Sequence, residues 1–299
     1  MVLTAQLLKL EQWMILTQVV TGQNFMTHQN NNINNISNKK LSVQLSLYGL
    51  SFLITNSTNK ESLFFSETEF EYTSSPEELL LHLQKAFIEQ IELQSTFNEV
   101  SLIYTTNLYN IVPKKLFDKT KASEYLKFNS KILANDFVAY DAIEEFDICT
   151  VYIPFININN YLFDRFGNFN YFHSTTILLK HLLNKEKHFS LPKVYINIHK
   201  NSFDFIAIKN GSLLICNTYE YKTSEDFIYY ILFCLEQLKL NPDRVDVYLS
   251  GAITKEDSNY TILYNYIRNI SFYTIKERNI NTPNHKVSDH QQLILKLLN

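Results

Sequence analysis

The stretch "VYINIHKNSFDFIAIKNGSLLICNTYEY", residues 194–221, alternates apolar and polar residues in three short runs. A period of two predicts half-buried β-strands, and the polar residues between the runs predict tight turns. The turn at Asn210-Gly211 is the most specific signal, because both central residues of a two-residue hairpin turn need positive φ, which Asn and Gly tolerate. The sequence therefore predicts an antiparallel meander of three strands.

The meander is followed by a predicted helix and a further strand. The helix opens at Thr223 or Ser224, either of which can serve as its N-cap, and runs to about Lys239. The run "RVDVYLSG", residues 244–251, then predicts a buried strand. The unit is thus three strands, a helix and a strand.

The same order of elements is predicted earlier in the chain. The runs "LSVQLSLYGLSFLI", residues 41–54, and "SLFFSETEFEY", residues 62–72, predict three strands. A helix is predicted to begin after Ser75, because Glu78 stands at the position that completes a capping box. The run "EVSLIYTT", residues 99–106, predicts the buried strand that ends the unit.

An alignment of the two halves indicates an internal duplication. Residues 41–52 match residues 194–205, and Val100 matches Val245 at nearly the same offset. Five elements in the same order favour duplication over chance, although few letters are identical. An insertion over about 107–147 has no counterpart in the second half.

The division into domains follows from this repeat. The first domain is predicted over residues 39–190 and the second over residues 191–299. Residues 1–38 are predicted to be disordered or loosely ordered, because they contain the Asn-rich run "THQNNNINNISNKK", which has nothing to bury.

Composition limits the classes of function. The chain has 299 residues, 45% of them hydrophobic, which is enough for two domains with cores. A net charge of -3 gives no global positive field, so no nucleic-acid partner is indicated. No apolar run reaches the length of a membrane-spanning helix. Three well-separated cysteines fit buried thiols in a reducing compartment, and we expect the protein in the cytoplasm.

The two most specific stretches are residues 195–214 and "RVDVYLSGAITKEDSNYTILYNYI", residues 244–267. With the duplication and the insertion, they resemble the actin-like ATPase superfamily, in particular its bacterial pilus-platform and cell-division branch. A closer resemblance is to an uncharacterised bacterial family, of Bacteroidota type, assigned that fold. The resemblance covers residues 41–275. It implies an α/β fold with mixed sheets, made of two ribonuclease H-like domains, that binds ATP and magnesium through two hairpins and a glycine pair.

The residues that fall on the two hairpins differ from those the family needs. The acid of the first hairpin falls on Gln44, and its glycine on Ser46; in the second they fall on Asn197 and His199. Magnesium is held by carboxylate or water oxygens, and phosphate approaches backbone N–H groups closely only where no side chain intervenes. Amides and side chains at these positions favour the loss of metal-dependent hydrolysis.

Two further positions bear on the expected nucleotide site. The glycine pair that holds adenosine falls on Gly251-Ala252, so this element is kept in part. Asp204 is the one carboxylate left in the second hairpin. It can be a metal ligand through water, but an acid at a strand start more often belongs to a solvated face, and that is the prediction.

Two functional hypotheses follow. The first is a pseudo-ATPase without catalytic residues, metal or cofactor, which serves as a binding or scaffold module for a protein partner. An aromatic content of 14% favours such a partner surface. The second is a nucleotide-binding switch or ATPase that holds ATP and magnesium through a non-standard site including Asn197, His199, Lys200, Gly251 and Ala252. Common catalytic motifs such as GxxxxGK[ST] and HExxH do not occur in the chain.

Overall fold

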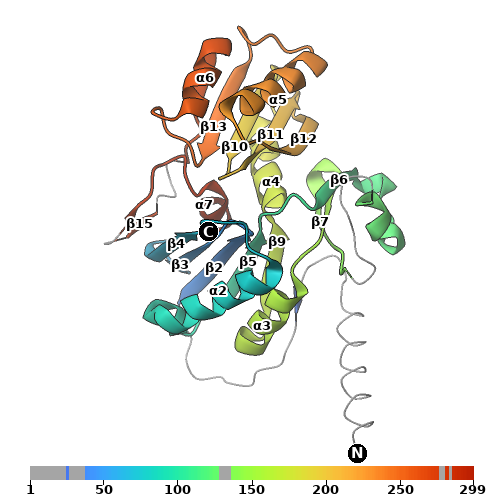
Figure 1. Ribbon diagram of the computed structural model, residues 1–299. Helices are drawn as coiled ribbons and strands as arrows, with labels where there is room; N and C mark the ends of the chain where they lie inside the picture. Colours follow the sequence, from blue (N-terminus) through green and yellow to red (C-terminus); the bar gives the residue numbers. More distant parts are fainter. Residues whose placement is uncertain (1–24, 27–37, 128–135, 276–279, 283–284) are drawn as a thin grey trace, which may run out of the picture. The chain divides into compact units, whose positions relative to one another are not determined.

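The computed structural model describes residues 25–26, 38–127, 136–275, 280–282 and 285–299 (Figure 1). The chain divides into two compact units between Thr176 and Ile177. The expected N-terminal extension lies outside the described residues except for Phe25–Met26, which form strand β1, and Asn38. The domain bounds predicted from the sequence stay predictions.

The first unit is built on a six-stranded mixed sheet. Its strands β2, β3 and β4 form an antiparallel meander, β5 runs parallel to β2, and β9 runs parallel to β5. In spatial order the strands are β1 (Phe25–Met26), β9 (Phe169–His173), β5 (Glu99–Tyr104), β2 (Lys39–Ser46), β3 (Gly49–Asn56) and β4 (Ser62–Glu69).

One face of this sheet carries the apolar core of the first unit. Leu41, Val43 and Leu45 lie at alternate positions of β2 and are fully buried. They belong to one cluster with residues of the helices α2 (Pro76–Glu89) and α3 (Ile156–Phe166). The predicted start of α2 is confirmed, since Ser75 and Glu78 form a capping box.

The predicted insertion contains a small sheet of its own. Its strands β6 (Tyr109–Pro113), β7 (Ala139–Ile143) and β8 (Ile148–Tyr152) pair antiparallel in the order β6-β8-β7. The short 3₁₀ helices of this unit are η1 (Ile91–Gln94), η2 (Lys114–Leu116), η3 (Lys119–Tyr125) and η4 (Glu144–Phe146). Strand β8 pairs with β6 and β7 and lies past residue 147, where the sequence predicts the end of the insertion.

The second unit is built on a five-stranded sheet with the same plan. In spatial order its strands are β12 (Ser212–Glu220), β11 (Ser202–Lys209), β10 (Lys193–Ile198), β13 (Asp246–Gly251) and β14 (Asn269–Phe272). Its helices are α5 (Ser224–Gln237), α6 (Ser258–Tyr266) and α7 (Leu293–Leu298), and β15 (Asn281–Thr282) pairs with β16 (His285–Lys286). Helix α4 (Ser174–Glu186) contains the division between the units.

The helix and turn signals of the second unit are confirmed. Thr223 caps α5, and its side chain accepts a hydrogen bond from the backbone of Asp226. Asn210 and Gly211 have φ of 52° and 68°, as the two-residue hairpin requires. Val194, Ile196 and Ile198 lie in the core on the face covered by α5 and α6.

The sheet orders show the duplication directly. The order β4-β3-β2-β5-β9 in the first unit corresponds to β12-β11-β10-β13-β14 in the second. Leu41 pairs with Val100, and its counterpart Val194 pairs with Val247. The predicted match of Val100 with Val245 is therefore wrong by two residues, a shift that a period-two pattern cannot detect because it keeps every side chain on the same face.

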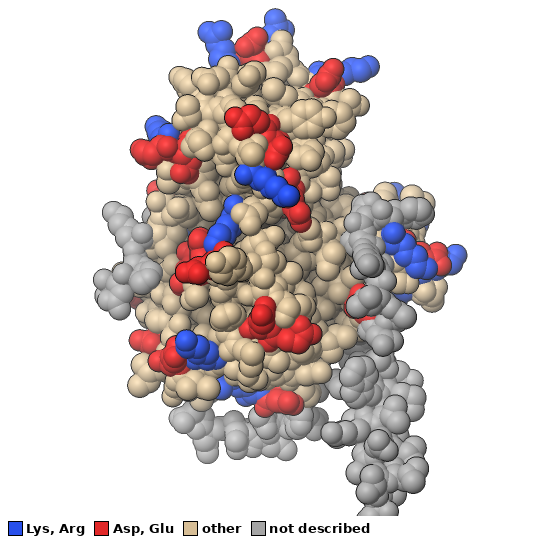
Figure 2. All heavy atoms as spheres, viewed as in Figure 1, with Lys and Arg blue, Asp and Glu red and all other residues tan. Residues whose placement is uncertain are grey.

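Among the described residues, no helix is long and apolar enough to cross a membrane. On the face seen in Figure 2, the coloured basic and acidic side chains are interspersed, and no large basic area gathers. This distribution agrees with the small net charge of -3.

Candidate functional site

A row of polar residues crosses four neighbouring strands of the second unit. Thr218 on β12 is the register partner of Asp204 on β11, Asp204 that of Asn197 on β10, and Asn197 that of Ser250 on β13. Successive side chains of a strand point to opposite faces. Because Ile196 and Ile198 enter the core under α5 and α6, the polar row lies on the other face of the sheet.

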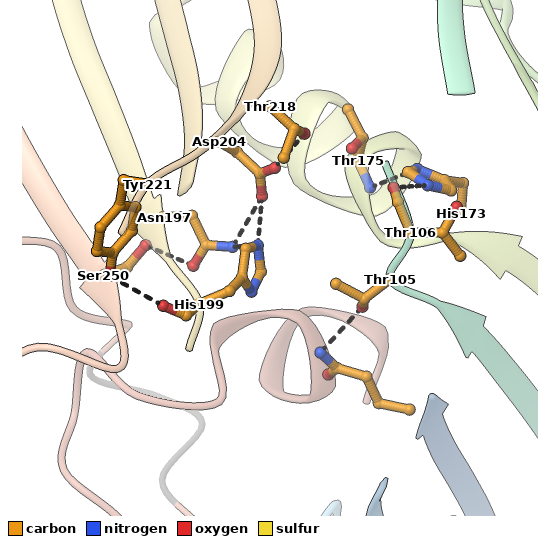
Figure 3. Close-up of polar contacts among 11 residues, drawn as sticks. Thr105, Thr106, His173, Thr175, Asn197, His199, Asp204, Thr218, Tyr221 and Ser250 are labelled. Carbon is orange, nitrogen blue, oxygen red and sulfur yellow. Dashed lines mark hydrogen bonds and ion pairs between the residues drawn. The ribbon is translucent and has the colours of Figure 1, made fainter. Parts of the chain in front are cut away.

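Hydrogen bonds join the whole row (Figure 3). Ser250 Oγ donates to Asn197 Oδ1 at 3.0 Å, and Asn197 Nδ2 donates to Asp204 Oδ2 at 3.1 Å. Thr218 Oγ1 donates to Asp204 Oδ1 at 2.7 Å. Both carboxylate oxygens of Asp204 are therefore hydrogen-bonded within the protein.

His199 adds a charge to the row. It follows β10 directly, and its ring turns back over the sheet so that Nε2 lies 2.8 Å from Asp204 Oδ2. Asp204 is only 5% exposed. The predicted solvated face residue is thus wrong, because the hairpin partner β10 and the outer strand β12 enclose the carboxylate.

The electrostatics of the pair favour the two charged forms. Burial lowers the pKa of His199, but the charge and hydrogen bond of Asp204 outweigh it, so the pKa is raised from 6.5. Burial raises the pKa of Asp204, but His199, Thr218 and Asn197 together outweigh it, so the pKa is lowered. Below the raised pKa of His199 the two groups form an ion pair.

The turn between β10 and β11 is fixed by other contacts. The backbone N–H of His199 donates to the Ser202 carbonyl at 2.8 Å. Tyr221 Oη donates to the His199 carbonyl at 3.3 Å, and Asn259 Nδ2 donates to Tyr221 Oη at 3.2 Å. The turn that would hold phosphate in the expected site is therefore fixed by its own backbone and by Tyr221, and the N–H of His199 is used within the chain.

Gly251 and Ala252 follow the strand that pairs with β10. Gly251 has φ of +88°, and a Cβ there would overlap the carbonyl oxygen of Ile198. The N–H of Ala252 donates to that same carbonyl at 2.8 Å, and the N–H of Gly251 donates to the His290 carbonyl at 2.9 Å. The close approach of two backbones thus accounts for the glycine, and both N–H groups are used within the chain.

The C-terminal part of the second unit covers this loop. His290 Nε2 lies 2.7 Å from the carbonyl oxygen of Ile253, and the His290 ring lies 4.3 Å from the ring of Phe272, centroid to centroid. The sequence analysis missed this contact. Nothing in the local pattern around His290 indicates it, because the partners are distant in the sequence.

The candidate residues of the first unit lie at the end of β2. Gln44 Nε2 donates to Thr105 Oγ1 at 3.2 Å, while Gln44 Oε1 is buried without a hydrogen-bond partner among the described residues. Ser46 Oγ accepts a hydrogen bond from the N–H of Tyr48 at 3.1 Å. The serine side chain therefore stabilises the turn between β2 and β3.

A second buried carboxylate, Asp141, lies in the first unit. It accepts hydrogen bonds from the N–H of His173 and from Thr176 Oγ1, each at 2.8 Å, and from Tyr152 Oη at 3.2 Å. His173 Nδ1 accepts from the N–H of Thr175, so Nε2 carries the proton and donates to a carbonyl at 3.1 Å. Asp141 thus ties the insertion to the start of α4.

The structure brings the predicted residues together in two sets. Gln44 and Ser46 lie near each other in the first unit. Asn197, His199, Gly251 and Ala252 lie near each other in the second, where Ile198 pairs with Gly251. Within the described part of the chain, no three His, Cys, Asp or Glu side chains are grouped so as to hold a metal ion. The second set can hold a proton or a charge on His199.

Comparison with protein families gives one match. The model of a family described as a protein of unknown function (DUF3822) matches residues 28–270. This range contains every candidate residue named above. A comparison with curated proteins gives no match.

Solved structures are similar to this chain to different degrees. A Bacteroides thetaiotaomicron protein, described as having an actin-like ATPase fold and unknown function, is similar with a TM-score of 0.75 and 21% identity over 90% of this chain and 98% of its own. The PilM-PilN type IV pilus biogenesis complex matches with a TM-score of 0.48 and 10% identity, over 79% of this chain and 88% of its own. The cytoplasmic domain of EpsL from Vibrio cholerae matches with a TM-score of 0.42 and 8% identity, over 87% of this chain and 92% of its own. The similarity to the Bacteroides protein shows that this chain has the actin-like ATPase fold.

Proposed function

We propose that this chain, which belongs to the DUF3822 family of unknown function and has an actin-like ATPase fold, is a binding or scaffold protein that does not hydrolyse ATP. In this proposal the fold provides surfaces for a protein partner. The three cysteines, which form no disulfide, suit a cytoplasmic protein.

The observation that carries the proposal is the closed hydrogen-bond network of Asp204. Its two oxygens accept from Thr218, Asn197 and His199. Magnesium binding, direct or through water, needs free carboxylate lone pairs. Three of the roughly four lone-pair sites of this nearly fully buried carboxylate are thus used, and freeing any of the three means breaking contacts to a buried charge, which costs several kcal/mol.

The other positions expected to bind ATP and magnesium also fit those ligands poorly. Gln44 has an amide where the expected site needs a carboxylate, and one end of that amide already bonds Thr105. The N–H groups of Gly251 and Ala252 donate to carbonyl groups of the chain itself. These contacts support the proposal that the chain holds neither the metal nor the adenosine.

Isothermal titration calorimetry tests the proposal. We expect that ATP with magnesium gives no binding heat beyond dilution with protein at about 50 µM, corresponding to a dissociation constant weaker than about 1 mM. The same titration without magnesium is the control. A magnesium-dependent dissociation constant near 10 µM would contradict the proposal.

The alternative is a nucleotide-binding switch with a non-standard phosphate site. It is favoured by the raised pKa of His199, which keeps a positive charge beside Lys200 at the turn after β10. This alternative predicts that ATP with magnesium binds to the protein. Because an anion needs the protonated histidine, its affinity should fall as the pH rises through the raised pKa of His199.

A further inference from the structure

Strands β9 and β14 are counterparts in the duplicated unit, but only β9 is paired on both sides. β9 pairs with β5 and with β1, whereas β14 pairs with β13 alone among the strands of the described residues. In the shared register, Phe169 and Asn170 of β9 correspond to Ile270 and Ser271 of β14. Phe169 and Asn170 are the two residues that β1 pairs with. The first unit thus has a strand at a place where the second unit has none.

The apolar side chains of these two strands are buried to different extents. Phe169 and Tyr171 of β9 belong to the core of the first unit and are 2% and 3% exposed. Their counterparts Ile270 and Phe272 pack against the core of the second unit but are only partly buried. The ring of Phe272 stacks on Tyr260 of α6, with centroids 5.7 Å apart. An apolar residue on a strand beside β14 would bury the remaining exposed area of Ile270 and Phe272.

The backbone of β14 has hydrogen-bonding groups on its outer side. The N–H of Tyr273 donates to the Leu249 carbonyl of β13 at 2.7 Å. Because alternate residues of a strand turn their N–H and C=O groups to the same side, Ser271 also faces β13, whereas Ile270 and Phe272 face outward. Among the described residues, no strand pairs with these outward groups. A segment that runs antiparallel to β14 can therefore exchange two hydrogen bonds with Ile270.

An arginine lies at the start of this edge. Arg268 comes directly before β14 and is exposed. Its side chain has no ion pair within the described part of the chain, and its N–H donates to the Pro242 carbonyl at 3.3 Å. The counterpart in the first unit is Gly167, which has no side chain. A guanidinium group binds carboxylates by charge and by hydrogen bonds, so it favours an acidic residue in a segment beside β14.

We propose that β14 is a docking edge for a partner protein, which supplies a short extended segment antiparallel to β14. The segment has an apolar residue opposite Ile270, as Met26 of β1 lies opposite Phe169. Two positions later it has an acidic residue, opposite Arg268. Main-chain hydrogen bonds give such a contact its affinity, and side chains at alternate positions give its specificity. The inference rests on the proposed binding function, because it names the surface on which a protein partner binds.

Fluorescence anisotropy with a labelled peptide tests the edge on the full chain. The peptide has the sequence of residues 22–30, GQNFMTHQN, with His28→Glu, which puts an acid two residues after Met26. We expect a dissociation constant of about 100 µM. Arg268→Glu in the protein should weaken binding roughly tenfold or more, and a peptide with His28→Lys should restore it. Lys209→Glu makes the same change of charge on β11, away from β14, and should leave binding unchanged.

Methylation of single peptide amides separates backbone pairing from side-chain contact. N-methylation at Met26 removes the N–H that faces the Ile270 carbonyl and should abolish binding. N-methylation at Phe25, whose N–H faces away from β14, should weaken binding less than about threefold. A peptide that does not bind at about 1 mM, or equal effects of the two methylations, overturns the proposal. Equal effects of Arg268→Glu and Lys209→Glu also overturn it, because the peptide would then bind elsewhere.

Sedimentation equilibrium of the full chain distinguishes a partner protein from a second copy. We expect that the wild type does not associate through β14 at about 100 µM. Self-association that Arg268→Glu abolishes would assign the edge to a second copy and overturn the proposal of a partner protein. Neither experiment contains ATP. A failure of the docking edge is therefore distinct from a failure of the proposed function, which the titration with ATP and magnesium decides.

Discussion

The two units share a strand order but differ in the chemistry of one row of residues. In the second unit the row is Ser250, Asn197, Asp204 and Thr218, joined by hydrogen bonds. In the first unit the register places Ile103, Gln44, Ser51 and Glu67 at the corresponding positions. Only the second row contains a buried charge.

The apolar face of each sheet is required by the fold, whereas the residues of the polar row are not. The apolar faces of both sheets are buried in the same way, because each unit must cover its sheet with helices. The polar face is under no such constraint, and the two rows have diverged.

The largest effect is expected from a charge in either core. Val43→Asp in the first unit and Ile196→Asp in the second each replace a fully buried residue at the same position of the repeat. An unpaired buried charge should lower the free energy of unfolding by about 4 kcal/mol or more. Urea unfolding followed by circular dichroism measures it. A well-folded variant of either kind would show that the equivalence of the two strands is wrong.

The next effect concerns a position where the units differ in backbone. Gly251 corresponds to Tyr104, which has an ordinary backbone conformation. Gly251→Ala should lower the free energy of unfolding by about 3 kcal/mol, because the new Cβ meets the Ile198 carbonyl and φ is +88°.

The same unfolding assay checks this prediction. Ala252→Ser, at the exposed neighbour of Gly251, is the matched control and should change the free energy of unfolding by less than about 0.5 kcal/mol. Equal stability of Gly251→Ala and the wild type would contradict the account of the backbone approach.

The polar rows themselves give the third prediction. Asp204→Ala leaves donors of Thr218 and Asn197 without their acceptor and should lower the free energy of unfolding by about 2 kcal/mol. Ser51→Ala at the counterpart position should lower it by less than about 1 kcal/mol. Chemical denaturation of both variants measures the difference. A larger effect at Ser51 would reverse the comparison.

A smaller effect depends on pH. The pKa of His199 is raised above 6.5 in the folded state, so its contribution to stability is complete below pH 6.5 and is lost as the pH rises through the raised value. The stability advantage of the wild type over His199→Gln should therefore be larger at pH 6 than at pH 9.

Removal of both charges is the control for this dependence. The difference in the free energy of unfolding between Asp204→Asn and the double variant Asp204→Asn with His199→Gln should change less with pH. The carboxylate that raises the pKa of His199 is absent from both proteins. An advantage of the wild type that grows from pH 6 to pH 9 would mean that burial, and not Asp204, dominates the pKa of His199.

The sequence predicts the shared face well. Apolar residues at alternate positions of β2 and β10 define which side enters the core, and local signals such as the capping box at Ser75 and the turn at Asn210-Gly211 are complete within a few residues. Such features depend on short-range physics, so a single sequence contains them.

The polar row is harder to predict because its partners come from four strands. An acid at a strand start gives no local sign of burial, and Asp204 is enclosed only when β12 brings Thr218 beside it. A signal existed in the hairpin itself. Period two places Asn197 and His199 on one face, and the pairing of β10 with β11 sets Asn197 opposite Asp204 on that same face.

Two other features were beyond the sequence. The N–H of Gly251 donates to the carbonyl of His290, which lies far from it in the sequence. The strands of the insertion, β6 to β8, have no counterpart in the repeat, so the alignment of the two halves gave no guide to them. Long-range pairing of this kind is decided by packing and not by local pattern.

The most direct test of the central claim is a thermal shift with ATP and magnesium. A complete site with a dissociation constant near 10 µM, at about 1 mM ATP, would stabilise the protein by about 2.7 kcal/mol. With an unfolding entropy of about 2.1 cal/mol/K per residue, the melting temperature would rise by about 4 °C for a chain of 299 residues. We predict a rise below about 1 °C, because Asp204 and the Gly251-Ala252 N–H groups are already bonded within the chain. A magnesium-dependent rise near 4 °C would contradict the loss of the nucleotide site.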